Sequence, residues 1–294
     1  MKTHHSIYNF AAIIGATTLS IAAVSPAQAV PIPTPTWQYA FDRFDDGYEA
    51  GKFGINSKFE FYGMAVAEDE NSILLALNSN LKLDGYKLGS ASGGVVDWGD
   101  IFLNFSGKDY NTAIANGDMF GIHFTDTSDS GVSQNGLYKV NTAKNVAGTN
   151  SGFKTLQSHT NQNKRQGVGN VPHTTYFQAT SDLKNVILDG DKIGEIAFLD
   201  KTALTNYGLN FLAQNAGAIG TQTFGFSFSK ADFPAGLSGN LIATIFAECN
   251  NDGIGIVAKV DPSVPLPEDV PEPATVLGLM TIASSAVGLR RRRA

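Results

Sequence analysis

Hydrophobic residues alternate with small or polar residues along most of this chain, and this pattern predicts β-strands. In residues 222–229, three phenylalanines fall on one face at period two, while glycine and serine fall on the other. Residues 101–105 place Ile101, Leu103 and Phe105 on one face and Asn104 on the opposite face. Further strands are expected at residues 59–66, 73–79, 119–124, 175–179, 193–199 and 241–248.

Turn-forming clusters separate these runs, and helical patterns are scarce. The chain has 31 glycines, many of them in clusters with Asn, Asp and Ser, and the clearest short helix candidate is residues 110–115. Many short strands with both alternating and continuous apolar runs predict an all-β fold, specifically a β-sandwich of jelly-roll type over residues 30–258.

Residues 141–172 break this pattern, because they are polar and show no apolar periodicity. A structureless segment of that length is uncommon inside a compact domain. We expect a mobile or variable surface loop here, and a functional loop is the alternative.

The first 29 residues have the organisation of a secretory signal peptide. A weakly basic start precedes an apolar stretch over residues 7–24, and Ala27-Gln28-Ala29 supplies the small-x-small pattern that signal peptidase accepts. Cleavage after Ala29 would begin the mature chain at Val30, whereas an uncleaved N-terminal anchor is the alternative.

The other end of the chain combines a proline-rich stalk, an uncharged run and a block of arginines. Residues 259–273 carry five prolines, which predicts an extended, semi-rigid stalk. Residues 274–289 contain no charged side chain and, as a helix, would span roughly 24 Å, a little short of the ~30 Å hydrocarbon core. The arginine stems at 290–293 can snorkel to make up the difference, and positive charge stays cytoplasmic. We therefore expect a transmembrane helix at 274–289, a basic cytoplasmic tail at 290–294, and the body of the protein outside.

This ending resembles the PEP-CTERM sorting signal of exosortase-dependent bacterial proteins. The residues that carry the resemblance are Pro271, Glu272 and Pro273, the uncharged run that follows, and the terminal arginines Arg290, Arg291, Arg292 and Arg293. The resemblance implies recognition of Pro-Glu-Pro by an exosortase, cleavage there, and transfer to the cell surface or the extracellular matrix. A permanent C-terminal anchor is the alternative.

Three stretches of the body look like landmarks of a cyanobacterial exosortase-dependent surface protein family. They are residues 61–65 (FYGMA), 98–102 (WGDIF) and 248–253 (ECNNDG). This second resemblance implies a location at the cell surface and no particular chemistry.

The charge and the cysteine content of the chain limit the partners and the cross-links that can be expected. Between the signal cleavage site and Pro-Glu-Pro, 16 basic and 26 acidic residues give a net charge near −10. An acidic body repels phosphate backbones, so no nucleic-acid partner is expected. Cys249 is the only cysteine, so no internal disulfide can form, and we expect a buried, inert thiol, with a reactive or intermolecular thiol as the alternative.

No familiar catalytic motif is present in the sequence. The mature chain keeps His123, His159 and His173, without metal-binding spacing and without a G-x-S-x-G nucleophile elbow. A glycosidase needs two carboxylates facing each other across a sugar, and Glu60, Glu195 and Glu248 all lie in expected strands. We expect a non-catalytic protein, with a carbohydrate-active enzyme of the extracellular matrix as the alternative.

For the body of the protein, the sequence supports ligand binding better than catalysis, and two ligands are candidates. Oxygen-rich clusters of the kind that wrap calcium occur at residues 42–49, 126–129 and 250–252, and none matches the EF-hand pattern. The first is the best candidate, with ligands Asp42, Asp45, Asp46 and Glu49, although such residues also simply make tight turns. Polysaccharide is the second candidate, because aromatic side chains on a sandwich face can stack on sugar rings; those available are Trp37, Tyr62, Trp98 and Tyr110.

These features together predict an exported bacterial surface or matrix protein. Signal peptidase and an exosortase would process it, and a membrane-anchored precursor would give a protein at the cell surface or outside the cell. The body would be a structural or adhesive module that binds polysaccharide or calcium.

Overall fold

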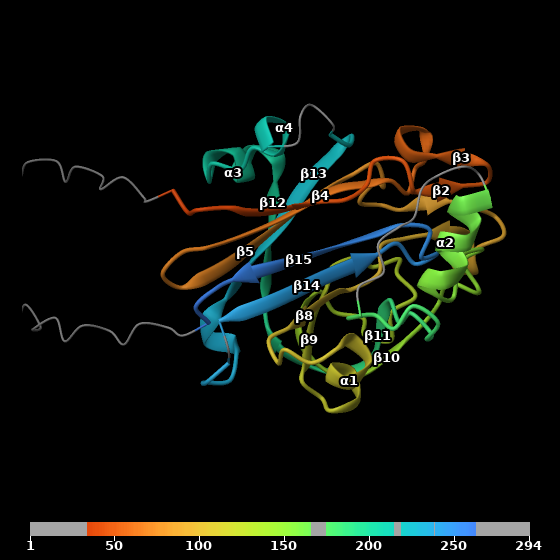
Figure 1. Ribbon diagram of the computed structural model, residues 1–294. Coiled ribbons are helices and arrows are strands. Elements are labelled where there is room, and N and C mark those ends of the chain that lie inside the picture. Colours follow the sequence, from red (N-terminus) through yellow and green to blue (C-terminus); the bar gives the residue numbers. More distant parts are fainter. Residues whose placement is uncertain (1–33, 166–174, 215–218, 238, 263–294) are drawn as a thin grey trace, which may run out of the picture. The chain divides into compact units, whose positions relative to one another are not determined.

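The computed structural model describes residues 34–165, 175–214, 219–237 and 239–262, and two antiparallel β-sheets form the framework of this part (Figure 1). The first sheet has five strands in the order β1 (Gln38–Phe41), β4 (Phe61–Glu68), β5 (Ser72–Ser79), β13 (Gln222–Ser229), β12 (Ile196–Asp200). The second has six strands in the order β11 (Val186–Gly194), β10 (Gly136–Lys144), β9 (Met119–His123), β8 (Ile101–Asn104), β14 (Asn240–Phe246), β15 (Gly253–Lys259). The expected all-β class is confirmed.

Short elements complete the described fold. Two small hairpins pair β2 (Tyr48–Glu49) with β3 (Lys52–Phe53) and β6 (Tyr86–Lys87) with β7 (Val95–Val96). The helices are α1 (Tyr110–Ala115), α2 (Leu156–Arg165), α3 (Lys201–Asn206) and α4 (Phe211–Gln214), with 3-10 turns at Gly54–Asn56, Ser92–Gly94 and Lys230–Asp232. The expected helix at 110–115 is confirmed as α1, which the Asp109 side chain caps by accepting a hydrogen bond from the Thr112 N–H.

The main core lies between the two sheets and follows the alternation in the sequence. Phe224, Phe226 and Phe228 of β13 are buried together with Ile101, Leu103 and Phe105 from β8 and the residue run that follows it. Trp98 is at the centre of this core, where its indole contacts Phe61 and Phe224 edge to face. The apolar residues that alternate along β8 and β13 therefore form one hydrophobic layer between the sheets, as the sequence predicts.

Both sheets are also covered on their outer faces, which explains the continuous apolar runs. Ala65 and Ala67 of β4 and Leu74 of β5 pack beneath Leu204 of α3 and Phe211 of α4. On the six-stranded sheet, the outer core includes Phe102, Tyr110, Met119, Tyr138 and Ile187, so that α1 covers that face.

The sheet order differs from that of a jelly roll. Strands β8, β9, β10 and β11 follow one another as a meander within one sheet, whereas jelly-roll strands form two Greek keys. The chain then passes into the five-stranded sheet at Glu195, between β11 and β12.

The two sheets meet at one edge, and this edge positions the candidate site. Strand β15 packs against β4 and β1. The Gln38 side chain donates to the Lys259 carbonyl (2.6 Å) and accepts from the Lys259 N–H (2.8 Å), in the manner of a strand pair. The end of β1 and the turn that joins β14 to β15 therefore lie close to each other.

Two expectations from the sequence are wrong. Residues 175–179 form turns instead of a strand, and Tyr176 and Phe177 pack against the outer core of the six-stranded sheet. Residues 141–165, the described part of the expected 141–172 loop, are not structureless, because β10 extends to Lys144 and α2 occupies Leu156–Arg165. The sequence does not predict α2, because the buried face of this helix consists of His159, Thr160 and Asn163 and not of an apolar stripe.

Within the described ranges, no helix is long and apolar enough to cross a membrane. The expected signal peptide (1–29) and transmembrane helix (274–289) lie outside the described residues, as do the basic tail and residues 263–273 of the stalk. The last strand ends at Lys259, and Val260 is still buried in the core.

Candidate functional site

Three carboxylates from distant parts of the sequence converge where the two sheets meet. One oxygen from each of Asp42, Asp46 and Asp252 lies within 4.8 Å of the corresponding oxygens of the other two. Asp42 directly follows β1, and Asp252 lies in the turn between β14 and β15. Because β1 belongs to the five-stranded sheet and β14 and β15 to the six-stranded one, the group joins both sheets.

Glu60, the residue before β4, is a fourth member. Its side chain is fully buried, and its Oε2 accepts a hydrogen bond from the Gly47 N–H (2.9 Å). Glu60 Oε2 and Asp252 Oδ2 lie on the same side of Gly47, at 2.6 and 3.0 Å from the position that a β-carbon there would take. Glycine at position 47 therefore leaves room for the two carboxyl groups. We refer to Asp42, Asp46, Glu60 and Asp252 as the acidic junction.

Backbone hydrogen bonds hold the loop of residues 42–48 over the junction. The Asp42 N–H donates to the Tyr62 carbonyl and the Tyr48 N–H donates to the Asn251 carbonyl. Helix α2 holds the middle of the loop, because His159 Nε2 and Asn163 Nδ2 both lie within hydrogen-bonding distance of the Asp46 carbonyl, at 3.0 and 3.1 Å. These contacts leave the Asp46 carboxyl group free to join the junction.

Three oxygens of the acidic junction are shielded from solvent and have no hydrogen-bond partner. They are Asp42 Oδ2, Asp46 Oδ1 and Glu60 Oε1. Only Asp252 has a donor for each of its oxygens, namely the Phe61 N–H (2.7 Å) and the Gly253 N–H (2.8 Å). Buried polar atoms are nearly always paired, so three orphaned oxygens in one place require an explanation.

Burial, and then the proximity of these groups to one another, strongly disfavours their ionised forms in the absence of a cation. Burial, and then the negative charge of Asp46, raises the pKa of Glu60 to about 9. Burial, and then the charge of Asp45, raises the pKa of Asp46 to about 7. Burial likewise raises the pKa values of Asp42 and Asp252 well above the ordinary range, and neighbouring carboxylates add to the effect.

No positively charged side chain forms an ion pair with the junction in the described part of the chain. The ion pairs found there involve none of its four members. Arg43 is close in sequence, but its guanidinium binds Asp45 through two nitrogens. Burial lowers the pKa of His159 to about 4, so this imidazole is neutral at physiological pH. The junction is therefore a buried cluster of carboxyl groups that pairs with no positively charged side chain in the described residues.

The four metal ligands expected from the sequence separate into two pairs. Asp42 and Asp46 lie in the acidic junction. Asp45 is exposed and paired with Arg43, and Glu49 accepts from the Lys58 N–H (2.9 Å) and lies 3.9 Å from Lys52 Nζ. The structure does not bring Asp45 and Glu49 to the junction, and it brings Glu60 and Asp252 there instead.

The sequence marks Glu60 as a strand glutamate and Asp252 as part of a separate oxygen-rich turn. No local signal in the sequence connects residue 42 with residue 252.

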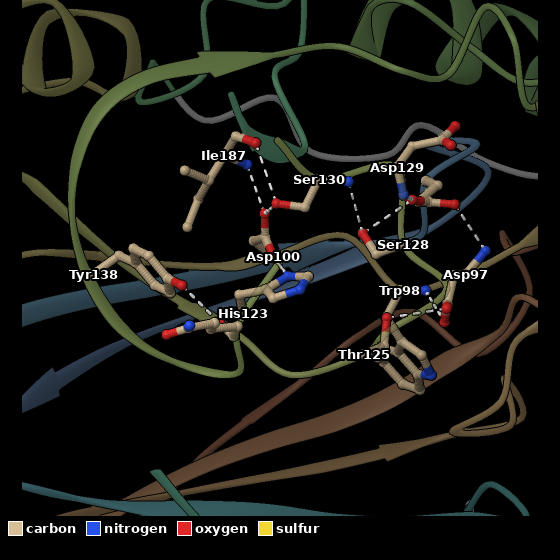
Figure 2. A network of polar contacts seen from close by, with 12 residues as sticks. Asp97, Trp98, Asp100, His123, Thr125, Ser128, Asp129, Ser130, Tyr138 and Ile187 are labelled. Atoms are coloured by element: carbon tan, nitrogen blue, oxygen red, sulfur yellow. Dashed lines mark hydrogen bonds and ion pairs between the residues drawn. The ribbon is translucent and has the colours of Figure 1, made fainter. Parts of the chain in front are cut away.

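A second group of buried acidic residues lies on the six-stranded side, and Figure 2 shows most of it. Asp100 accepts from Ser130 Oγ (2.8 Å) and the Ile187 N–H (2.6 Å), and its other oxygen lies 2.8 Å from His123 Nδ1. Asp97 accepts from the hydroxyl groups of Thr125 (3.0 Å) and Thr127 and from the Trp98 N–H (2.7 Å).

Glu248 completes this second group. It accepts from the Asp97 N–H (3.0 Å), the Ser128 hydroxyl (3.1 Å) and the Asp129 N–H. Burial is the largest influence on it and raises its pKa to about 7. We refer to Asp97, Asp100, His123 and Glu248 as the satisfied network, because every carboxylate oxygen in it has a donor or faces the imidazole.

The satisfied network does not have the geometry of nucleophilic catalysis. Ser130 donates to Asp100 and not to His123, whereas an activated serine must donate to the imidazole that takes its proton. The network instead connects the start of β8, the 125–130 loop, β11 and the end of β14, which is a structural role.

The residues considered for sugar chemistry are scattered. Glu60 and Glu248 belong to different hydrogen-bonded groups, and the Glu195 side chain is 83% exposed and paired with Lys192. Three of the four aromatic residues considered for sugar stacking are buried, namely Tyr62, Trp98 and Tyr110, and Trp37 is half-buried with its Nε1 bound to the Tyr207 carbonyl.

The remaining predicted site residues lie outside the described ranges. These are the signal-cleavage residues Ala27 and Ala29, the sorting residues Pro271, Glu272 and Pro273, and the arginines 290–293.

Comparison with known proteins matches the end of the chain to the PEP-CTERM protein-sorting motif, over residues 269–293. This match supports an exported protein that an exosortase sorts to the cell surface or beyond it. No curated protein and no solved structure was found to match the chain. The resemblance to a cyanobacterial surface protein family remains a prediction.

Proposed function

We propose that this chain is an exosortase-processed bacterial surface or extracellular-matrix protein whose β-sandwich is a non-catalytic structural or adhesive module. The observation that carries the proposal is the sorting motif at residues 269–293. In the precursor, residues 274–289 would span the membrane and the arginines at 290–293 would stay in the cytoplasm. Signal peptidase would act after Ala29, and the exosortase at Pro271-Glu272-Pro273.

Two observations favour a module without catalysis over a carbohydrate-active enzyme. The candidate carboxylates do not form a facing pair: Glu195 points to solvent, and Glu60 and Glu248 belong to separate buried groups. The buried His–Asp pair lacks a serine that donates to the imidazole. A glycosidase needs two carboxyl groups across an open sugar site, and no described feature favours one.

Polysaccharide binding receives no support from the aromatic side chains that first suggested it, because most of them belong to the core. A structural module with covered sheet faces fits the observed packing, since helices α1, α3 and α4 cover the outer faces of the sheets.

The proposal is tested by the location of the protein in its native host. In the wild type, the body should be recovered from the surface or medium, whereas Glu272→Ala should keep it in the membrane fraction because the exosortase no longer recognises its site. Glu268→Ala is the matched control, since it removes a glutamate from the same stalk outside the Pro-Glu-Pro motif. Equal distribution of wild type and Glu272→Ala would contradict the proposal.

A further inference from the structure

The acidic junction has the properties of a site built for a cation. A buried carboxylate is costly unless it is paired, hydrogen-bonded or bound to a metal. The satisfied network shows how this chain pairs buried acids when no ion is needed, because Asp97 and Glu248 have a donor for each oxygen. The junction has no such donors for three of its oxygens.

Glu60 provides a separate observation that points to a ligand. It is not one of the three converging aspartates, it is fully buried, and its Oε1 has no partner. Its Oε2 lies beside Asp252 Oδ2 against Gly47, and the charges of Asp46 and Asp42 act on its carboxyl group, so Glu60 adjoins the three aspartates. A fully buried glutamate with one oxygen that lacks a donor suits a ligand that carries positive charge.

The chemistry of the donors selects the kind of cation. All four side chains offer carboxylate oxygen, which hard cations prefer, and the nearest imidazole, His159, already binds the Asp46 carbonyl. Zinc and copper favour nitrogen and sulfur ligands, which the junction does not supply. The ligands come from irregular loop and strand-end positions on two sheets, and calcium tolerates such geometry better than magnesium does.

A cavity that opens towards solvent borders the junction at Asp42. Asp42 and Gly253, the neighbour of Asp252, line a cavity of about 360 Å³ that extends along β14 and β15 beside Tyr176 and Phe177. A metal site needs such a route, because its ligands are otherwise closed in by the fold.

We propose that Asp42, Asp46, Glu60 and Asp252 bind one calcium ion, which joins the two sheets at their shared edge. The ion neutralises the junction and gives the three orphaned oxygens a partner. It links the end of β1, the 42–48 loop, the start of β4 and the β14–β15 turn. The sandwich contains one cysteine and therefore no disulfide, so the ion takes the place of a covalent link between the sheets.

The test is the melting temperature of the purified full chain, first freed of metal with EDTA and then titrated with calcium. At a calcium concentration about a hundredfold above the dissociation constant, we expect the wild type to melt about 5 °C or more higher than in EDTA. Metal analysis should give one calcium per chain.

Two variants locate the effect. Glu60→Gln and Asp46→Asn each remove one charged ligand with almost no change in volume, and each should abolish the calcium-induced shift. Both variants should remain folded in EDTA, because each removes a charge from a crowded group. Asp45→Asn is the matched control: it makes the same change one residue away at an exposed, Arg43-paired position and should keep the full shift.

Several results would overturn the proposal. A wild type that melts at the same temperature in calcium and in EDTA, with no bound metal, would mean that protons alone neutralise the junction. An undiminished shift in Glu60→Gln and Asp46→Asn would place the ion elsewhere, and an equal shift with magnesium would exclude a calcium-selective site. Because the purified chain is used, these outcomes are independent of whether an exosortase processes the protein.

Discussion

At the scale of single residues, buried acidic side chains occur in two kinds of environment, one with hydrogen-bond donors for every oxygen and one without. Hydroxyl and backbone N–H donors surround Asp97 and Asp100 (Figure 2), and they surround Glu248 as well. Asp46 and Glu60, in contrast, keep oxygens that have no donor. The difference lies in the neighbouring residues: threonines and serines fill the loop at 125–130, whereas glycine and backbone carbonyls surround the junction.

Glu248 should make the free energy of unfolding depend on pH, and a single substitution isolates its contribution. Its pKa is about 7 in the folded chain and near 4.5 when unfolded, so between these pH values the folded state holds a proton that the unfolded state has lost. Stability from this group is therefore present below about pH 4.5 and is lost as the pH rises towards 7, by on the order of 3 kcal/mol. Urea unfolding in EDTA at pH 5 and pH 7.5 should show a larger loss in the wild type than in Glu248→Gln.

Parallel losses in the two proteins would contradict this role for Glu248. Buried acids distant from Glu248 are common to both proteins, so their contributions cancel in the comparison.

At the scale of elements, the strands were easier to predict than the connections between them. The alternation of Phe224, Phe226 and Phe228 correctly identified β13 and its buried face, because period two reports directly which side faces the core. Helix α2 has no such signal, since its buried face consists of His159, Thr160 and Asn163. Hydrogen bonds to the Asp46 carbonyl take the place of apolar packing, and their partner lies more than a hundred residues away.

The same limit applies to the candidate site. Asp42 and Asp46 are identifiable from the sequence as neighbours in an acidic stretch. Asp45 lies between them in the sequence, but its side chain pairs with Arg43. Asp252 reaches the site because β15 packs against β1 and β4, and that pairing depends on the whole sandwich. Composition indicated an oxygen-rich loop, whereas tertiary packing determined which oxygens converge.

Helix α2 should support the junction through its contact with the 42–48 loop. Asn163→Ala removes one of the two donors to the buried Asp46 carbonyl, which should lower the free energy of unfolding by roughly 2 kcal/mol and raise the calcium concentration at half-saturation. Asn161→Ala is the control on the same helix, since Asn161 is exposed, and it should change stability by no more than about 0.5 kcal/mol. Urea unfolding and calcium titration of both variants provide the comparison, and equal effects would show that α2 does not hold the loop.

At the scale of the whole molecule, the fold and the sorting motif describe a module made for export. The sandwich relies on its three apolar clusters, with Cys249 buried as a lone thiol, so its folding needs no disulfide chemistry. A calcium ion between the sheets would add stability in the compartment to which the sorting motif directs the protein.

The central claim is that this chain is sorted by cleavage at its C-terminal motif, and the intact mass of the protein recovered from its native host tests it most directly. The account predicts a wild-type mass that lacks the residues after the Pro-Glu-Pro motif, including the four arginines, and a Glu272→Ala mass that retains them. An arginine tail that is present in both proteins would contradict it and would make the C-terminus a permanent anchor.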